Sequence, residues 1–140
     1  MKLRIEEDTL TLRLTRPEIA ELAAKGRLEV VTPLGAGQAF RYRLEAAEVQ
    51  AIALAWADGV LTVQLPASAA AAWPTSGQLG FARAIDTGAG KVLTVRVEWD
   101  FKGEQAPERK ARRQEAMEEA YGVERDDRAD RDGERDEPGD

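Results

Sequence analysis

The second half of the chain repeats the pattern of the first half. The segment "LTLRLTRPEIAELAAKGRLEV" covers residues 10–30, and "LTVQLPASAAAAWPTSGQLGF" covers residues 61–81, 51 positions further along. Six of the 21 aligned residues are identical, and apolar residues alternate with polar ones in the same phase. After a two-residue insertion, "GAGQAFRYRLE" aligns with "GAGKVLTVRVE". An internal duplication accounts for this agreement better than a chance likeness, and it predicts that the two halves fold alike.

The first half reads as two strands, a helix and two more strands. Residues 10–14 alternate apolar and polar side chains, as half-buried strands do. Thr15 and Glu18 have the spacing of a capping box, in which each side chain satisfies a backbone N–H group at the start of a helix. We expect this helix to run to about Lys25, with Gly26 as its C-terminal cap.

The second half repeats these elements with a different helix. Pro66 starts an alanine-rich helix, which we expect to end before Pro74 because the residue preceding a proline is disfavoured in the helical conformation. After this helix, the alignment places Phe81 in the position of Val30. The repeats cover about residues 1–46 and about residues 49–99.

The connections between neighbouring strands are short, so they predict antiparallel hairpins. The expected fold class is therefore α+β and mostly antiparallel, with a ββαββ unit present twice. Eight strands that each have one apolar face would bury those faces in a closed barrel or between two packed sheets. The two helices would cover open ends or edges of the sheets. We assign residues 1–102 to this domain.

One expected strand is apolar on both sides. In "VQAIALAWA" (residues 49–57) large apolar residues lie on one side and mainly alanines on the other. A strand that is apolar on both faces is usually covered on both faces. We expect a helix or a second subunit on the alanine face, and the second case predicts a symmetric homodimer.

The formal charge is carried by the C-terminal segment. Residues 1–102 are neutral, and residues 103–140 hold the whole net charge of −6. Within this acidic tail, residues 107–121 have a weak helical pattern, and the rest has the composition of a disordered segment. Two interpretations stay open: a solvated tail without a partner, or an interaction tail that binds a basic surface such as an arginine face of the domain itself.

The charge and hydropathy also exclude several classes of partner. Binding to nucleic acid depends on many cationic contacts with phosphates, so we expect no nucleic-acid partner. No apolar run approaches the length of a membrane-spanning helix, and the N-terminus has no apolar segment of the secretory type. We therefore expect a cytoplasmic protein without membrane contact.

The chain has no cysteine and no histidine. Disulfides, thiolate nucleophiles, imidazole bases and metal sites built from these two residue types are therefore excluded. The carboxylates show neither the paired arrangement of acid–base catalysis nor the pattern of a calcium loop. We predict no catalytic residues, no metal and no cofactor.

The segment "AIDTGAG" contains the Asp-Thr-Gly-Ala signature of aspartic proteases at Asp86. In the single-domain proteases of that class, further strands and a helix follow the signature, whereas one strand remains here before the tail. Aspartate, threonine and glycine are also common turn residues. A hairpin turn is the favoured interpretation, and a protease the alternative.

Four arginines occupy polar positions of the expected strands: Arg13, Arg41, Arg43 and Arg96. If neighbouring strands bring them together, they form a basic face that can bind a carboxylate or phosphate through two parallel hydrogen bonds. The alternative is a solvated outer face balanced by glutamates. Trp56, Trp73 and Trp99 end apolar patterns, so we interpret them as packing residues, with a stacking pocket as the alternative.

Several motifs together resemble a family of small, uncharacterised bacterial proteins: "KLRIEEDTLTLRLTRPEIAELAAKGRLEV", "FRYRLE", "VLTVQLP" and "LTVRVEWDF". The resemblance covers about residues 1–101 and rests on strand and helix patterns. In that family the closing Asp-Phe is often followed by a cysteine, whereas Gly103 stands there in this chain. The resemblance implies no activity.

The leading hypothesis is a non-enzymatic binding or accessory module that contacts a protein partner or a small anionic ligand. The alternative is an enzyme or ligand-processing domain with a site inside the barrel, where Arg83 is expected to face inward. A filled core favours the first hypothesis, and a cavity lined with polar residues favours the second. A purely structural dimer is a third possibility.

Overall fold

The chain divides into two units, Met1–Gln105 and Ala106–Asp140. The structure is a computed structural model that describes residues 1–101 of the first unit and residues 115–120 of the second. Residues 115–120 are helical and exposed. The other residues of the helix expected at 107–121, and the remainder of the acidic tail, lie outside the described residues.

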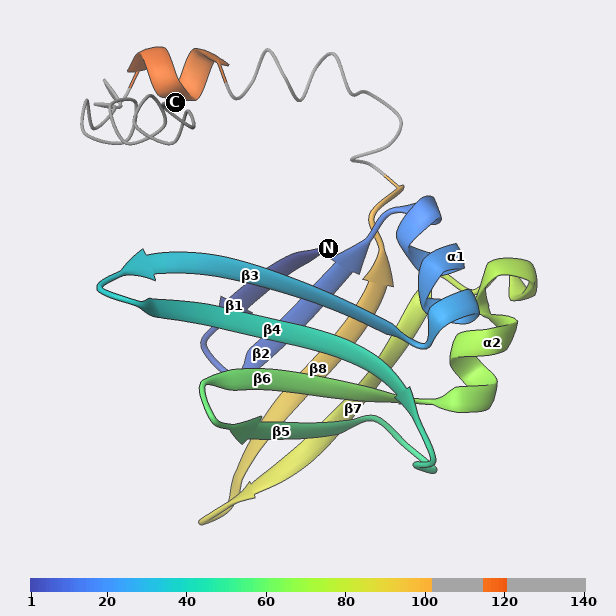
Figure 1. Cartoon of the computed structure of the whole chain (residues 1–140). Helices are drawn as coiled ribbons and strands as arrows, with labels where there is room; N and C mark the ends of the chain where they lie inside the picture. Colours follow the sequence, from blue (N-terminus) through green and yellow to red (C-terminus); the bar gives the residue numbers. More distant parts are fainter. Residues whose placement is uncertain (102–114, 121–140) are drawn as a thin grey trace, which may run out of the picture. The chain divides into compact units, whose positions relative to one another are not determined.

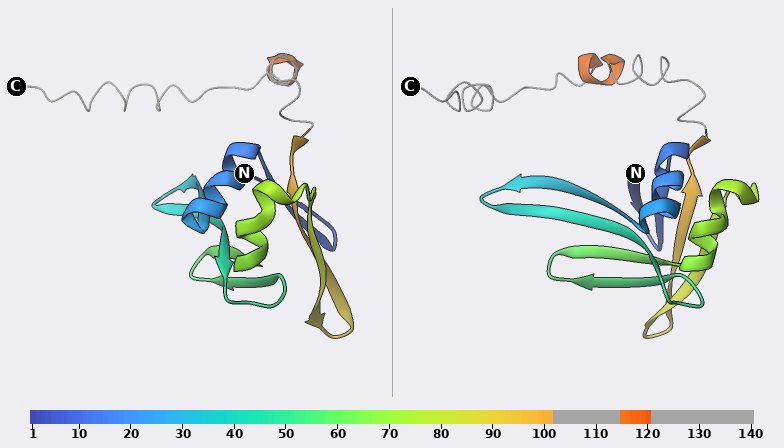
Figure 2. Two further views of the ribbon diagram at one scale, coloured as in Figure 1. Left: turned by 90° about the vertical axis from the view of Figure 1, so that its right-hand side faces the viewer. Right: turned by 45° about the vertical axis from the view of Figure 1, so that its right-hand side comes forward.

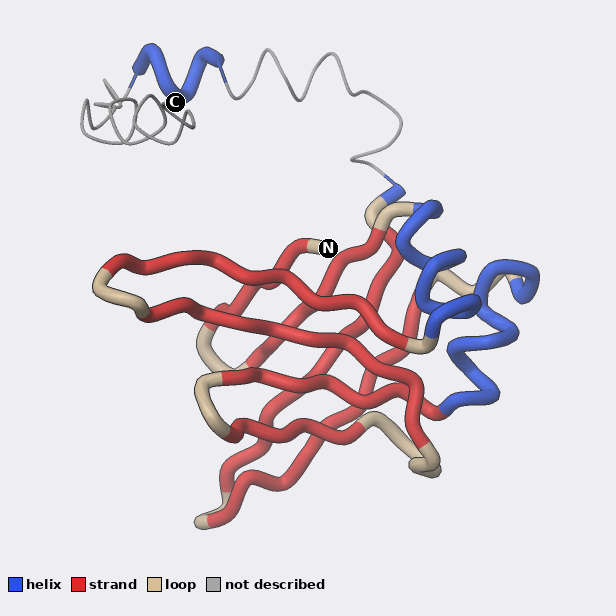
Figure 3. Tube along the Cα trace, in the orientation of Figure 1, coloured by secondary structure: helices blue, strands red, loops and turns tan. Residues whose placement is uncertain are grey.

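Residues 1–101 run through the same series of elements twice, strand–strand–helix–strand–strand (Figures 1 and 3). The elements of the first half are β1 (Lys2–Glu6), β2 (Thr9–Leu14), α1 (Arg16–Lys25), β3 (Arg27–Gly35) and β4 (Gln38–Ala47). Those of the second half are β5 (Ala53–Ala57), β6 (Val60–Pro66), α2 (Ala67–Ser76), β7 (Gly80–Gly88) and β8 (Lys91–Trp99). The predicted α+β class and the predicted order of elements are confirmed.

The strands form two four-stranded sheets, in the orders β1-β2-β8-β7 and β3-β4-β6-β5. Each sheet thus contains one hairpin from each half. The four predicted hairpins are antiparallel. The central pairs, β2 with β8 and β4 with β6, are parallel. These pairs join strands that are distant in the sequence, so no turn pattern indicated them.

Equivalent strands of the two halves pair in the same register. In one sheet Leu10 of β2 lies opposite Val95 of β8, and in the other Leu61 of β6 lies opposite Tyr42 of β4. Leu61 is the counterpart of Leu10 in the sequence alignment, and Tyr42 is the counterpart of Val95. Exchanging the two halves therefore maps one sheet onto the other.

The predicted alignment of the strands after the helices was wrong by two residues. Arg27 of β3 and Gly80 of β7 occupy the same register position, opposite equivalent residues of β4 and β8. Phe81 therefore takes the place of Leu28 and not of Val30. The two extra residues follow α2 and precede β7. In this segment the carbonyl oxygen of Gln78 accepts a hydrogen bond from the indole of Trp73 in α2.

The two sheets share one apolar core, and their strands cross when viewed as in Figure 1. Both helices lie at the same end of the sheets, where α1 packs against α2 (Figure 2). The sheet edges β1, β7, β3 and β5 are not joined within residues 1–101, so the closed barrel is not formed there. The largest fully buried side chains come from both sheets and from α1: Leu12, Leu14, Leu22, Leu44, Val63, Leu65, Val95 and Val97.

The alanine face of β5 has no helical cover within residues 1–101. Ala55 and Ala57 are exposed, and α2 packs on β4 and β6 instead. The first explanation for these alanines, a covering helix, is therefore wrong for the described residues. A second subunit on this face stays a prediction.

Helix α1 begins and ends as its sequence predicts. The Thr15 side chain accepts a hydrogen bond from the Glu18 backbone N–H, and the Glu18 carboxylate accepts one from the Thr15 backbone N–H (3.0 Å). Gly26 ends the helix with φ of 76°, a left-handed conformation that glycine adopts without steric cost. The capping box and the C-terminal cap are both confirmed.

Helix α2 continues past Pro74, so its predicted end was wrong. Two hydroxyl groups of the last turn donate to backbone carbonyls: Ser76 to Trp73 (3.1 Å) and Thr75 to Ala72 (3.3 Å). The Trp73 side chain is also almost fully buried. Packing of the Trp73 side chain thus outweighs the local preference of the proline.

Candidate functional site

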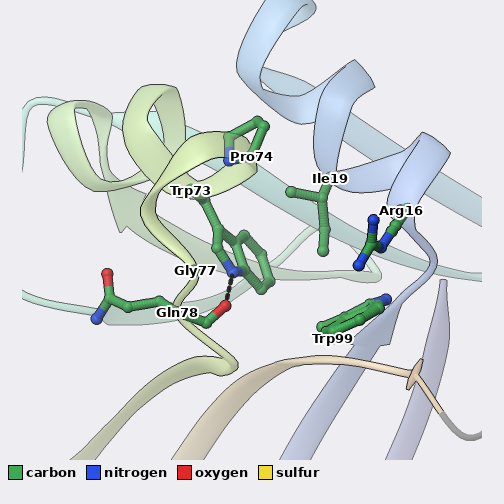
Figure 4. Close-up of a pocket in the computed structure, with 7 residues that line it drawn as sticks. All are labelled: Arg16, Ile19, Trp73, Pro74, Gly77, Gln78 and Trp99. Atoms are coloured by element: carbon green, nitrogen blue, oxygen red, sulfur yellow. Dashed lines mark hydrogen bonds between the residues drawn. The ribbon is translucent and has the colours of Figure 1, made fainter.

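A pocket of about 190 Å³ lies between the two helices and the end of β8. Figure 4 shows that its lining comes from the start of α1, the end of α2 with the chain that follows it, and the last residue of β8. The lining residues are Arg16, Ile19, Trp73, Pro74, Gly77, Gln78 and Trp99. Arg16 is the one charged residue among them. The pocket therefore combines apolar walls with a single cationic group.

The parallel pairing of β2 with β8 brings Arg16 to Trp99. Leu14, the last residue of β2, lies opposite Trp99, the last residue of β8. Thr15 then caps α1, and Arg16 is the first residue of that helix. The capping box fixes the first turn of α1, and the Arg16 side chain in this turn lies above the Trp99 ring.

The guanidinium of Arg16 stacks on the indole of Trp99. Its central carbon lies 4.5 Å from the ring centroid, within the range of a cation–π interaction. The Trp99 ring also packs against Phe101, with 5.5 Å between the centroids. Arg16 and Trp99 take part in further interactions as well. A guanidinium has five N–H donors, so a stacked Arg16 can keep other contacts and still donate to an anion.

Trp73 forms the opposite wall of the pocket. Its side chain is 2% exposed, and its Nε1–H donates a hydrogen bond to the carbonyl oxygen of Gln78 (2.9 Å). The ring meets Phe81 edge to face, with 5.2 Å between the centroids. Since the N–H group is already satisfied, Trp73 offers the pocket only apolar ring surface.

The two halves of the chain differ at the residues that make this pocket. The position of Arg16 in the first half corresponds to Ala67 in the second, since each is the first residue of its helix. The partner of Leu65 in the β4–β6 pair is Ala46, which corresponds to Trp99. The equivalent place at the end of the other sheet, where β4 pairs with β6, therefore has two alanines in place of the cation and the indole.

Glu18 lies one turn into α1 and affects the charge near the site. Burial raises the pKa of its carboxyl, but hydrogen bonds from the Met1 ammonium and from Thr15, together with the ammonium charge, lower it more. The net result is a pKa below the ordinary glutamate value. Glu18 is thus ionised and paired at neutral pH, and its partners are Met1 and Thr15.

Residues 1–116 match DUF7009, a family of unknown function. The chain belongs to this family. The resemblance to an uncharacterised family that the sequence motifs indicated is thereby confirmed. Comparisons with curated proteins and with solved structures found no significant match. Membership of DUF7009 carries no activity with it, so function has to be argued from the geometry of the chain.

The structure divides the four predicted arginines of this DUF7009 member between two sheets. Arg13 and Arg96 project from the outer face of the β1-β2-β8-β7 sheet, where Arg96 lies opposite Thr11. Arg41 and Arg43 project from the outer face of the other sheet, on β4. A single basic face made of all four does not form. Two separate pairs take its place.

Glutamates accompany both pairs. On one sheet Glu98 lies 3.6 Å from Arg13 and 3.9 Å from Arg96. On the other sheet Arg43 donates to Glu29 at 2.8 Å. This hydrogen bond is the main cause that lowers the pKa of the Glu29 carboxyl below its ordinary value. The balanced outer face expected as the alternative is present around Arg13, Arg43 and Arg96.

Other sequence candidates lie away from the pocket. Asp86 belongs to the β7–β8 hairpin, where its side-chain oxygen accepts a hydrogen bond from the Gly88 backbone N–H (2.8 Å). The turn interpretation of "AIDTGAG" is thus confirmed. Arg83 lies opposite the buried Val95, on the inner face of the sheet as predicted, but it is exposed and donates to the carbonyl oxygen of Ile52 (2.6 Å). It does not line a cavity inside a barrel.

The three tryptophans have three different environments. Trp73 is buried, as expected for a packing residue, whereas Trp56 is 62% exposed and stacks on Phe40 with 6.1 Å between the centroids. The prediction of a core position was wrong for Trp56. Its strand β5 is at the edge of the sheet and, within residues 1–101, pairs only with β6, so the indole has a strand beside it on one side alone. Trp99 is partly buried and packs against the core, as expected for a packing residue, and it also lines the pocket; a stacking role toward a ligand stays a prediction.

Residues 1–101 and 115–120 contain neither a metal-binding cluster nor a membrane-spanning helix. No group of three or more aspartates and glutamates in this part of the chain is arranged to hold a metal ion. No helix among these residues has the length and hydropathy required to cross a membrane.

Sequence reasoning missed Arg16 and the role of its contact with Trp99. Arg16 follows an N-cap residue, a place where many residue types occur, and Trp99 is far away in the sequence. The signal that could have indicated them is the comparison of the two halves. Arg16 and Trp99 both have alanine as their counterpart; Arg16 is the first residue of α1, two positions after β2, and Trp99 is the last residue of β8.

Proposed function

We propose that this DUF7009 member is a non-enzymatic binding module that holds a small anionic ligand in the pocket between its helices. The observation that carries the proposal is the stacked pair of Arg16 and Trp99 at the pocket wall. A guanidinium that is held in place by an aromatic ring loses less conformational freedom when it binds a carboxylate or phosphate. A pocket with one fixed cation selects a ligand with one compact anionic group.

The lining of the pocket supports binding and not catalysis. Its charged or polar side-chain groups are the Arg16 guanidinium, the Gln78 amide and the indole N–H groups of Trp73 and Trp99, of which the first is hydrogen-bonded to a carbonyl. Acid–base catalysis needs a side chain that can exchange a proton near neutral pH, and covalent catalysis needs an activated nucleophile. Neither kind of group is among the seven lining residues.

The proposal includes the origin and packing of the fold. We propose an internal duplication of a ββαββ unit, which the equal registers of the β2–β8 and β4–β6 pairs support. The two sheets would then form a sandwich in which each hairpin has a counterpart in the opposite sheet. In this scheme the two halves diverged at the pocket: the helix start and the strand end that meet there have Arg16 and Trp99, whereas the equivalent positions at the other sheet have alanines.

A matched pair of arginine variants tests the proposed function. Arg16→Gln removes the pocket cation, and Arg41→Gln removes an exposed arginine of the outer sheet face. Thermal unfolding of each variant and of the native protein is measured with acetate, inorganic phosphate and benzoate over a concentration series. A ligand that binds the folded state raises the melting temperature in a saturable way.

The proposal expects saturable stabilisation of the native protein by at least one of these anions, kept in Arg41→Gln and lost in Arg16→Gln. Absence of any stabilisation overturns it. An effect that disappears in Arg41→Gln but persists in Arg16→Gln moves the site to the outer sheet face. Mass spectrometry of the recovered ligand shows whether it is chemically unchanged, and conversion would favour the enzyme alternative.

A further inference from the structure

We infer that the ligand is an aromatic carboxylate with a single ring, in which the ring fills the pocket and the carboxylate binds Arg16. This inference rests on the proposed function and adds the part of the ligand that does not carry charge. The argument comes from the volume of the pocket, the chemistry of its walls and the position of its one cation.

The volume of the pocket suits one ring. At about 190 Å³ it is slightly larger than a cavity of about 150 Å³ that holds one benzene molecule in another protein. The difference leaves room for a small substituent on the ring. Inorganic phosphate or acetate alone would leave most of the apolar wall in contact with water.

The walls of the pocket are apolar on the side away from Arg16. Figure 4 shows Ile19, Trp73 and Trp99 around the same space, with Arg16 above the Trp99 ring. Because the indole N–H of Trp73 donates to the Gln78 carbonyl, the ring offers no donor to the ligand. An uncharged polar group there would lose its water without gaining a partner.

The cation lies at one end of this apolar space. Arg16 stacks on Trp99, and Trp73 lies on the other helix across the pocket (Figure 4). A flat ring between Trp73 and Ile19 would bury both of its faces, and a carboxylate at its edge would reach the guanidinium. Aromatic pairs gain attraction beyond the area that they bury, so a flat ring is preferred to a saturated one.

A ligand series tests this inference on the unmodified full-length protein. Dissociation constants are measured by NMR titration for acetate, cyclohexanecarboxylate, benzoate and benzyl alcohol. Acetate has the anion without the ring, cyclohexanecarboxylate has a ring without aromatic character, and benzyl alcohol has the aromatic ring without the charge. We expect benzoate to bind about tenfold or more tightly than acetate, because it buries a whole ring.

Benzoate should also bind about threefold or more tightly than cyclohexanecarboxylate, because only the flat ring can stack on an indole. Benzyl alcohol should bind more weakly than benzoate, since it lacks the charge for Arg16. Equal affinities of benzoate and cyclohexanecarboxylate overturn the aromatic part of the inference. Equal affinities of benzoate and acetate overturn the whole inference.

The outcomes separate this inference from the proposed function. If acetate or phosphate binds in an Arg16-dependent way and benzoate has no advantage, the anion site stands and the ring is refuted. If neither inorganic phosphate nor any of the four compounds binds, both fail. The affinities of a Trp99→Leu variant for benzoate and acetate provide an independent test, with Trp56→Leu as the control. Loss of the ring beneath Arg16 should weaken the binding of both benzoate and acetate, and an unchanged affinity for both contradicts the role given to the stacked pair.

Discussion

Replacement of Trp73 by alanine should destabilise the protein strongly, because this residue fixes both the packing of α2 and the inner wall of the pocket. The side chain is 2% exposed, packs edge to face on Phe81 and donates a hydrogen bond to Gln78. Replacing a buried tryptophan with alanine costs about 3–5 kcal/mol. Trp56 offers a matched control, since its side chain is 62% exposed.

The control substitution removes little more than one ring contact. Trp56 stacks on Phe40, and such a pair contributes about 0.5–1.5 kcal/mol. We therefore expect Trp56→Ala to cost about 1 kcal/mol. A loss of 3 kcal/mol in Trp73→Ala corresponds to a fall in the melting temperature of about 12 °C or more for a domain of this size.

Urea unfolding followed by far-UV circular dichroism measures both variants, because fluorescence would change with the number of tryptophans. The denaturant slope should stay close to that of the native protein, so that the change appears in the midpoint. A free energy of unfolding that falls equally in the two variants contradicts the assigned burial. So does a loss below about 1 kcal/mol in Trp73→Ala, since a buried indole costs more to remove.

Three further predictions concern the elements around the pocket. Thr15→Ala should lower the free energy of unfolding by about 1 kcal/mol through loss of the N-cap, while Thr75→Ala, at an exposed position, should change it by less than about 0.5 kcal/mol in the same urea titration. The folded-state pKa of Glu18 is lowered, so the stabilising contribution of this carboxylate is complete above the ordinary glutamate pKa of about 4.3 and is lost as the pH falls through the folded value. The urea midpoint should therefore decrease less on acidification in Glu18→Gln than in the native protein. An identical decrease in the two proteins contradicts the lowered pKa assigned to Glu18. Gly80→Ala should destabilise the protein by about 2–3 kcal/mol because the added Cβ would collide with the backbone of β8. The control Ala82→Ser on the same strand should change the stability by less than about 0.5 kcal/mol. Similar melting temperatures for the two variants would refute the close approach of Gly80 to β8.

Elements with local signals could be predicted from the sequence. Helix α1 begins with a capping box and ends at a glycine, and both devices act within a few residues. The hairpin at Asp86 is specified by the same kind of local chemistry, an aspartate that accepts a hydrogen bond from the turn backbone. The ββαββ order followed because every element in it carried such a signal at one end or the other.

Features that depend on distant contacts could not be predicted. The parallel pairing of β2 with β8 joins the two ends of the domain, and apolar alternation gives no indication of which strand is the partner. The arginines were expected on one face because the sheet to which each strand belongs was unknown. Helix α2 passes Pro74 because Trp73 is held by packing, which outweighs the local preference of the proline.

The pocket combines both kinds of feature. The capping box at Thr15 determines where α1 begins, and this part was read from the sequence. The contact between Arg16 and Trp99 also requires the parallel register that places Leu14 opposite Trp99. Comparison of the two halves includes these two residues among the positions with an alanine counterpart, but it does not single out Arg16, since Glu18 and Ile19 also have alanines at their equivalent positions.

The most direct test of the central claim is a titration of the ¹⁵N-labelled full-length protein with benzoate, followed on the indole N–H signals of its three tryptophans. Single replacements by phenylalanine assign the signals of Trp56, Trp73 and Trp99. The account predicts saturable shifts for Trp73 and Trp99, which line the pocket, and an unchanged signal for Trp56, which does not. Shifts confined to Trp56, or no saturable shift at any of the three, would contradict a ligand site between the helices.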